Sequence, residues 1–231
     1  MHQISNFIYA DDSLLDMDIP TKHLPNPYAD TPYILIKNFF TALECQHIVQ
    51  SVLISKEVVN AQLRGAAVDE NIRKTDIYTL ENPQRSLYNS RFDEFREEIE
   101  RFFSISLTGS TDVQVLGYEI GDFYLKHSDD SSELRTKNGE TIGFKCVAPA
   151  RKLTTVLFAT SHANEVIDKG CFSGGELVFN YLMDEQGDTI ILRPEAGDMV
   201  VFLSNPYFSH EVLPVTAGFR LSLAQWHNAL L

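Results

Sequence analysis

Two short stretches, YLKHSD at 124–129 and SHEVLPVTAGFRLS at 209–222, decide how this chain is interpreted. His127 and Asp129 lie two positions apart in the first stretch. Because strand side chains alternate between the two faces, both project to the same side of a predicted strand. His210 lies on a second predicted strand far downstream. The pattern therefore predicts a strand-built site in which these three side chains bind one metal ion.

A guanidinium accompanies the three predicted ligands. Two histidines and one carboxylate form the ligand set of non-haem Fe(II) oxygenases, which leaves other coordination positions open. Arg220 and Ser222 share one face of the next predicted strand, and a guanidinium can bind a carboxylate with two parallel hydrogen bonds. A metal beside a carboxylate receptor is what a 2-oxoglutarate cosubstrate requires. The pair of His127 and Asp129 is weak on its own, so the interpretation depends on the complete set.

Length and charge limit the class of protein. With 231 residues and 44% hydrophobic content, the chain is long enough to bury a core, and a single domain spanning 1–231 is expected. The formal net charge of −13 argues against a nucleic-acid surface, which would be basic. We interpret the acidic surface as solvated.

The cysteines and the N-terminal residues bear on location. Cys45, Cys146 and Cys171 are odd in number and widely spaced, which favours neither a disulfide framework nor a zinc site. Reduced thiols fit the cytoplasm. Aspartates in the first twenty residues argue against a signal peptide, and no apolar run approaches membrane length. We expect a cytoplasmic protein without a membrane or nucleic-acid partner.

The first half of the chain predicts two helices between short strands. Thr41 and Glu44 form a capping-box pattern, and Asn82 before Pro83 is a typical helix start with asparagine as the cap. The apolar stripes that follow are typical of core packing rather than of a cofactor site. We expect an irregular proline-rich lead-in at 1–32 and strands at 33–40 and 73–80.

From residue 112 the pattern changes to short strands separated by turns. Eight antiparallel strands of this length suit a two-sheet jelly roll. We therefore expect a mainly β fold, α+β overall. A double-stranded β-helix core of the jelly-roll or cupin type would occupy 112–231, and a helical support region 1–111. The predicted strands are 113–120, 123–128, 153–160, 176–180, 189–192, 199–203, 209–213 and 219–227.

The ordered motifs of residues 112–228 resemble the Fe(II)- and 2-oxoglutarate-dependent dioxygenases of the prolyl 4-hydroxylase type. This resemblance covers about half of the chain. Many animal and plant members carry lysine in place of Arg220, so the chain is more similar to the bacterial and oxygen-sensing branches. The motifs run YEIG at 118–121, FYLKHSD at 123–129, RKLTTVLF at 151–158, GGELVF at 174–179, PEAGDMVVF at 194–202 and SHEV at 209–212, followed by Pro214, Gly218, Arg220 and Trp226.

The resemblance implies a cofactor set and a role for each site residue. Fe(II), 2-oxoglutarate and O2 would take part, with ascorbate as a further candidate cofactor. Phe158 takes the position at which some relatives carry a tyrosine that reaches the cosubstrate, so another group would have to donate that hydrogen bond. The implied metal ligands are His127, Asp129 and His210. The implied cosubstrate residues are Arg220, Ser222, Tyr118 and Tyr124.

The implied reaction is hydroxylation of an unactivated C–H bond with release of succinate and CO2. The leading hypothesis is a prolyl or similar side chain of a protein or peptide as substrate. Asp129 favours hydroxylation, because halogenating relatives leave this ligand position to chloride. Three alternatives remain: hydroxylation of a free amino acid or small metabolite, a cupin-type metal-binding protein that works without 2-oxoglutarate, and an interaction module with a relict triad. Arg220 with Ser222 argues against the second, and the intact ligand set against the third. The oligomeric state stays open.

Three further features admit two readings each. Asp130 offers a rival carboxylate, but a regular strand would direct it away from Asp129. Trp226 shares a face with Arg220 and would either line the cosubstrate pocket or pack in the core. The insert at 130–150 would be a solvated loop or a substrate-binding loop. A positive balance up to residue 152 hints at an anionic group in the substrate.

Overall fold

Two facing sheets form the centre of the computed structural model, which describes residues 1–3, 7–11, 33–54, 58–60, 71–166 and 168–230. Most of the predicted lead-in, 12–32, lies outside the described residues. The larger sheet has the order β3-β17-β12-β20-β8-β6-β4, and β7 also pairs with β20. Its strands are β3 (Tyr33–Ile36), β17 (Met199–Leu203), β12 (Arg151–Phe158), β20 (Arg220–Leu230), β8 (Gln114–Tyr118), β6 (Asp76–Tyr78), β4 (Val58–Asn60) and β7 (Ser106–Ser110).

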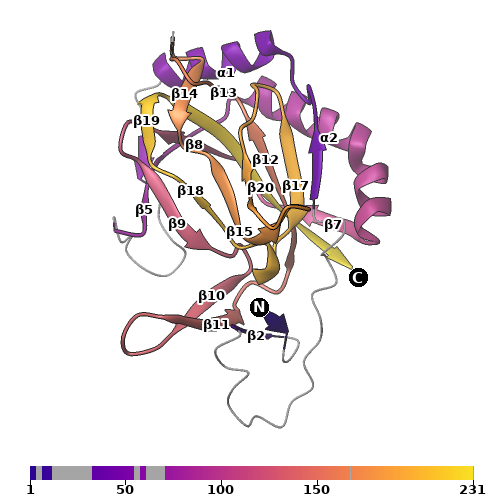
Figure 1. Cartoon of the computed structure of the whole chain (residues 1–231). Coiled ribbons are helices and arrows are strands. Elements are labelled where there is room, and N and C mark those ends of the chain that lie inside the picture. The colour runs from indigo at the N-terminus through magenta and orange to yellow at the C-terminus, as the bar shows by residue number, and fades with distance from the viewer. Residues whose placement is uncertain (4–6, 12–32, 55–57, 61–70, 167, 231) are drawn as a thin grey trace, which may run out of the picture.

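The smaller sheet lies across from the larger one and has the order β16-β15-β18-β9-β5 (Figure 1). A three-stranded sheet of β13, β14 and β19 adjoins the pair. This two-sheet arrangement confirms the predicted mainly β jelly roll. The strands are β16 (Thr189–Leu192), β15 (Leu177–Met183), β18 (His210–Val212), β9 (Phe123–His127), β5 (Arg73–Lys74), β13 (Ser161–His162), β14 (Cys171–Gly174) and β19 (Val215–Gly218).

The two helices cover the outer face of the larger sheet (Figure 1). Helix α2 (Asn82–Phe103) packs there because Tyr88 bonds the Thr155 hydroxyl at 2.9 Å and Phe92 stacks on the His227 ring at 4.4 Å. Thr155 and His227 are on strands β12 and β20. Because strand side chains alternate, their neighbours point instead into the space between the sheets.

The helix starts are only partly as predicted. Helix α1 (Ala42–Ile54) has the expected capping box, since the Glu44 carboxylate accepts from the Thr41 backbone N–H at 2.7 Å and the Thr41 hydroxyl accepts from the Glu44 N–H at 3.2 Å. The prediction that Asn82 caps α2 is wrong. Asn82 is already helical, and Glu81 is the cap without a side-chain cap bond.

The insert at 130–150 forms a hairpin and not a solvated loop. Strands β10 (Ser131–Arg135) and β11 (Thr141–Cys146) pair with each other, and β11 pairs with β2 (Ile8–Ala10), which pairs with β1 (His2–Gln3). This small sheet projects from the open end of the jelly roll (Figure 1). Phe144 is fully buried and contacts Tyr181 of β15 edge to face. Packing and an added N-terminal strand thus order a segment whose charges suggested a loop.

The strand predicted at 73–80 is split. Residues of β5 pair with β9 in the smaller sheet, whereas β6 pairs with β8 in the larger sheet. Thr75, which lies between them, donates its hydroxyl to the Gly117 carbonyl at 2.8 Å. The chain therefore crosses from one sheet to the other at this residue.

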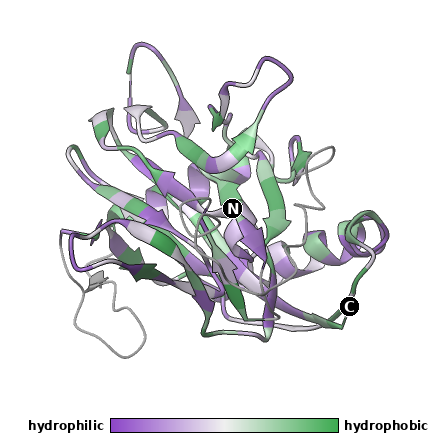
Figure 2. Ribbon diagram, turned by 60° about the horizontal axis from the view of Figure 1, so that its bottom comes forward, coloured by the Kyte–Doolittle hydropathy of each residue, from purple (hydrophilic) through white to green (hydrophobic). Residues whose placement is uncertain are grey.

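Hydrophobic residues follow the central strands, and hydrophilic residues predominate on the outer loops (Figure 2). The core contains the middle of β12, β17 and β20, whose apolar side chains are almost wholly buried. Within the described ranges, no helix is long and apolar enough to span a membrane. The site lies where this core opens, at the end of β9 and the start of β18.

Candidate active site

The three predicted ligands meet at one point. His127 ends β9 and lies opposite His210 of β18 in the strand ladder, with ring centroids 4.3 Å apart. Asp129 follows just after β9, and its Oδ1 is 3.8 Å from the His127 Nε2. Potential ligand atoms of the three residues all lie within 4.8 Å of one another. One metal ion can therefore contact all three.

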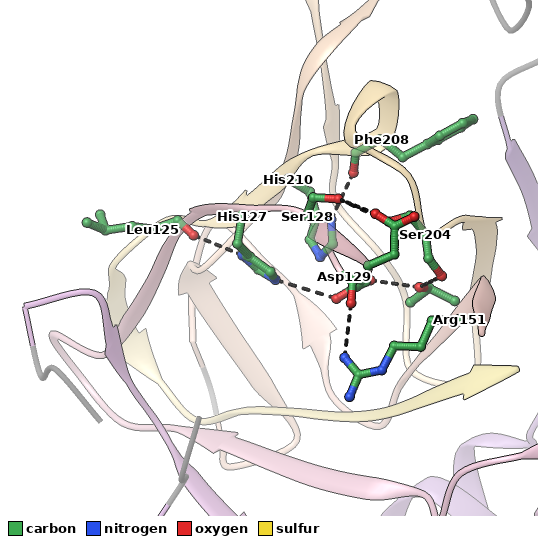
Figure 3. A network of polar contacts seen from close by, with 10 residues as sticks. Leu125, His127, Ser128, Asp129, Arg151, Ser204, Phe208 and His210 are labelled. Carbon is green, nitrogen blue, oxygen red and sulfur yellow. Dashed lines mark hydrogen bonds and ion pairs between the residues drawn. The ribbon is translucent and has the colours of Figure 1, made fainter. Parts of the chain in front are cut away.

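The two imidazoles are oriented by backbone carbonyls (Figure 3). His127 Nδ1 is 2.9 Å from the Leu125 carbonyl oxygen, and His210 Nδ1 is 3.0 Å from that of Phe208. A carbonyl oxygen only accepts, so each Nδ1 carries the proton and donates it. In a neutral imidazole of this tautomer, Nε2 carries the lone pair that can bind a metal.

The protonation of the site suits a cation. Burial, together with the neighbouring His210, lowers the pKa of His127 to about 3, so that imidazole is neutral at pH 7. Burial alone would raise the pKa of the Asp129 carboxyl. The imidazoles of His210 and His127 and the Thr154 hydroxyl outweigh burial and lower that pKa. A neutral imidazole at His127 and an ionised carboxylate at Asp129 fit Fe(II) by donor type and charge.

Asp129 is held by groups from the larger sheet. The Thr154 hydroxyl donates to its Oδ2 at 2.7 Å. Arg151 donates from Nη1 to its main-chain carbonyl at 3.0 Å (Figure 3) and stacks over the Trp226 ring at 4.4 Å. The Trp226 indole N–H helps to lower the pKa of Asp129, although it has no hydrogen-bond partner of ordinary geometry among the residues that the structure describes. Trp226 thus lies beside the carboxylate of the candidate ligand Asp129.

A bulge in β9 places Tyr124 on the same side as His127. Val212 lies two positions after His210 in β18, whereas its partner Tyr124 lies three positions before His127 in β9. The Tyr124 ring stacks on the His127 ring at 3.6 Å. Burial raises the pKa of Tyr124 to about 12, so its hydroxyl stays protonated. The bulge makes Tyr124 a neighbour of the candidate metal ligand His127, although the two residues are three positions apart.

Arg73 of β5 was not recognised from the sequence. Arg73 is 6% exposed, and its guanidinium lies over the Tyr124 ring, 4.8 Å from the ring centre. Its Nε has no hydrogen-bond partner among the described residues. A buried donor without a partner is costly. The only signal for Arg73 in the sequence is a charged residue beside an apolar one in a short strand. This pattern is too common to identify a site residue.

Arg220 lies at the inner face of the larger sheet and is 1% exposed. Its Nε donates to the Gly175 carbonyl at 2.9 Å and its Nη1 to the Ser222 hydroxyl at 2.9 Å. Within the described part of the chain, no carboxylate pairs with it. Burial lowers the pKa of Arg220, but a guanidinium stays charged. The result is a buried cation with no counter-ion among these residues.

The walls around Arg220 are aromatic. Tyr118, its partner across the β20–β8 ladder, lies under the guanidinium at 4.8 Å from the ring centre. Phe158 and Phe172 lie at 5.4 and 5.9 Å. The structure thus brings Ser222 and Tyr118 to Arg220, and Tyr124 to the ligand triad. Phe158 lines the Arg220 pocket as an apolar wall.

Asp130 does not compete for the metal position. Its Oδ1 accepts from the Ser131 hydroxyl at 2.6 Å and from the Ser128 hydroxyl at 3.2 Å. The strand has ended before this residue, so local hydrogen bonds rather than strand alternation turn its carboxylate aside.

The metal-site half of the chain matches a known family. The model of the 2OG-Fe(II) oxygenase superfamily matches residues 113–228. The putative prolyl 4-hydroxylase of Acanthamoeba polyphaga mimivirus is 26% identical over 217 residues, covering 90% of this chain and 78% of that protein. The probable prolyl 4-hydroxylase 10 of Arabidopsis thaliana is 24% identical over 212 residues, covering 82% of this chain and 66% of the plant protein.

Solved structures share the fold. A prolyl-4-hydroxylase of Pseudomonas putida superposes with a TM-score of 0.61 at 23% identity, covering 87% of this chain and 94% of that one. A Trichoplax adhaerens prolyl hydroxylase, in complex with a peptide fragment of a hypoxia inducible factor oxygen degradation domain, gives 0.65 at 20% identity, covering 87% and 85%. With its family match, its jelly roll and its His-Asp-His cluster, the chain belongs to the 2OG-Fe(II) oxygenase superfamily and is an oxygenase of the prolyl 4-hydroxylase-like kind.

Proposed function

We propose that this protein hydroxylates a prolyl or similar side chain of a protein or peptide, with Fe(II) held by His127, Asp129 and His210. Arg220 would bind the far carboxylate of 2-oxoglutarate. The observation that carries the proposal is the buried Arg220 guanidinium, which has no counter-ion in the part of the chain that the structure describes and lies on the sheet that also holds Asp129 in place. A buried unpaired charge is strongly destabilising, so a site that retains one is suited to an anionic ligand.

The protein contributes binding, orientation and exclusion of water. Fe(II), when bound with O2 and 2-oxoglutarate, supplies the oxidising power to insert oxygen into a C–H bond, with succinate and CO2 as products. Arg220 has five N–H donors, of which Gly175 and Ser222 occupy two. The remaining donors can form a two-pronged contact with a carboxylate. Tyr118, Phe158 and Phe172 exclude water from this contact and so strengthen it.

A peptide substrate is supported by the polar groups beside the triad. Arg73 and Arg151 flank Tyr124 and Asp129 from two sides. The Nε–H of Arg73 lacks a partner among the described residues, and peptide carbonyls would satisfy it. The Trichoplax relative, solved with a peptide fragment bound, and the prolyl 4-hydroxylase names of the sequence relatives agree with this choice. Hydroxylation of a free amino acid remains the second candidate, because the same donors suit an amino-acid carboxylate.

The test is a succinate-release screen with Fe(II) and 2-oxoglutarate over proline-containing peptides, free amino acids and a protein lysate. Mass spectrometry should find a gain of one oxygen on a peptide or protein, coupled to succinate. A reaction without 2-oxoglutarate is the control. Coupling to free amino acids alone would contradict the peptide assignment. Failure of 2-oxoglutarate to raise the melting temperature of the Mn(II)-loaded protein would contradict the cosubstrate assignment.

A further inference from the structure

The Asp129 carboxylate offers two oxygens to a metal, and the structure distinguishes them. Oδ1 faces the His127 Nε2 at 3.8 Å, whereas Oδ2 accepts the Thr154 hydroxyl at 2.7 Å (Figure 3 shows the surrounding network). We propose, on the basis of the function proposed above, that Thr154 is a positioning residue that restricts Asp129 to binding the metal through Oδ1 alone.

The direction of each hydrogen bond follows from a proton count. An ionised carboxylate only accepts, so Thr154 donates its single hydroxyl proton to Asp129. Thr154 Oγ1 also lies 2.9 Å from the Ser204 hydroxyl. With its own proton used, Thr154 must accept there, and Ser204 must donate. The three groups form a directed chain from Ser204 through Thr154 to Asp129, in which each bond polarises the next.

The hydrogen-bond chain is held in place at its Ser204 end. Ser204 follows β17, and its carbonyl accepts from the Asp130 backbone N–H at 3.1 Å. The Ser128 hydroxyl, 3.1 Å from the same carbonyl, shares its one proton between that oxygen and Asp130 Oδ1. Ser204 therefore contacts the ligand loop on both sides of Asp129 as well as supporting Thr154. The loop and the carboxylate are fixed to the same point of the larger sheet.

Thr154 itself has little freedom. It is 1% exposed in β12, between Phe202 of β17 and Trp226 of β20. A β-branched side chain in a central strand is stiff about its first torsion. Its hydroxyl can then serve as a fixed reference for the carboxylate, which no flexible surface donor could do.

One-oxygen binding matters because coordination positions are limited. Two imidazoles and one carboxylate oxygen leave open positions for further ligands, and a carboxylate can also bind through both oxygens. If Oδ2 were released, it could occupy a position that the cosubstrate or O2 requires. Thr154 thus keeps that position open.

Thr154→Val removes the hydroxyl with little change in side-chain shape, whereas Thr154→Ser keeps the hydroxyl. Thr155→Val is the matched control, because Thr155 is the equally buried neighbour that bonds Tyr88 on the opposite face. Co(II) titration gives the Kd, and the visible absorption of bound Co(II) reports the coordination. We expect Thr154→Val to weaken Co(II) binding by roughly 10- to 100-fold and to alter the spectrum. Thr154→Ser and Thr155→Val should match the wild type.

A Thr154→Val protein with an unchanged spectrum and a Kd within threefold of wild type would overturn the inference. If that variant does not fold, Ser204→Ala decides instead, because it removes the donor to Thr154 and should shift the Co(II) Kd in the same direction. An unchanged Kd in that variant would also overturn the inference. Absence of Co(II) binding by the wild type would overturn the metal site, and with it the proposed function.

Discussion

Replacing Arg220 with methionine should separate cosubstrate binding from folding. Each hydrogen bond from a charged group contributes about 1.5–3 kcal/mol. Loss of two parallel bonds to the carboxylate costs about 3–6 kcal/mol, which is roughly 10²- to 10⁴-fold in the Kd of 2-oxoglutarate. Calorimetric titration of the Mn(II)-loaded protein measures this Kd directly.

The unliganded Arg220→Met protein should keep its stability. The Gly175 carbonyl and the Ser222 hydroxyl lose a donor, which costs about 1–3 kcal/mol each. Removal of a buried charge that has no counter-ion in the described ranges stabilises the folded state by several kcal/mol, so the two effects nearly cancel. Ser222→Ala is the control and should weaken 2-oxoglutarate binding far less. An Arg220→Met protein that binds 2-oxoglutarate within threefold of wild type would refute the assignment.

Three further substitutions test other parts of the structure. His210→Ala should abolish Fe(II)-dependent succinate formation, and persistent iron-dependent turnover would contradict the ligand set. Gly175→Ala should destabilise the fold by about 1–3 kcal/mol, because Gly175 has φ +61°. It should also weaken 2-oxoglutarate binding, because the new Cβ would lie 3.0 Å from the Arg220 Cδ. The control is Gly139→Ala, at φ +87° with open space around it, which should leave 2-oxoglutarate binding unchanged. Burial and the nearby Arg96 lower the pKa of His227 to about 3. Since the unfolded chain protonates this residue near pH 6.5, stability should fall as the pH drops from 6.5 towards 3, by about 2 kcal/mol at pH 5. His227→Gln should remove this share of the pH dependence in urea unfolding at pH 7.5 and 5, and an identical dependence would contradict the burial of a neutral imidazole.

The sequence predicted the jelly roll and the cluster of three ligands because both depend on local periodicity. Strands β12 and β20 pair without a register shift from Leu153 to Phe158. The side chains of His127 and Asp129 still lie at one site, although Asp129 lies beyond the end of β9. Arg220 and Ser222 share a face as expected, and hydrogen bond to each other. These features follow from the side-chain period of a strand.

The features that were missed depend on contacts between distant segments. The bulge that brings Tyr124 to His127 is set by pairing with β18 and has no local signature. The role of Thr154 depends on its hydrogen bond to Asp129, which forms because β12 lies beside residues 128–130. The hairpin at β10–β11 did carry a local signal, an Asn138–Gly139 turn with Gly139 at φ +87°, but its charges favoured a solvated loop.

The geometry of the metal and cosubstrate is tested most directly by a crystal structure of the wild-type protein with Mn(II) and 2-oxoglutarate. We predict one metal ion on Nε2 of His127, Nε2 of His210 and a single oxygen of Asp129, with the far carboxylate of 2-oxoglutarate on the Arg220 guanidinium. A metal bound away from these three side chains, or a cosubstrate carboxylate that does not contact Arg220, would contradict the assignment.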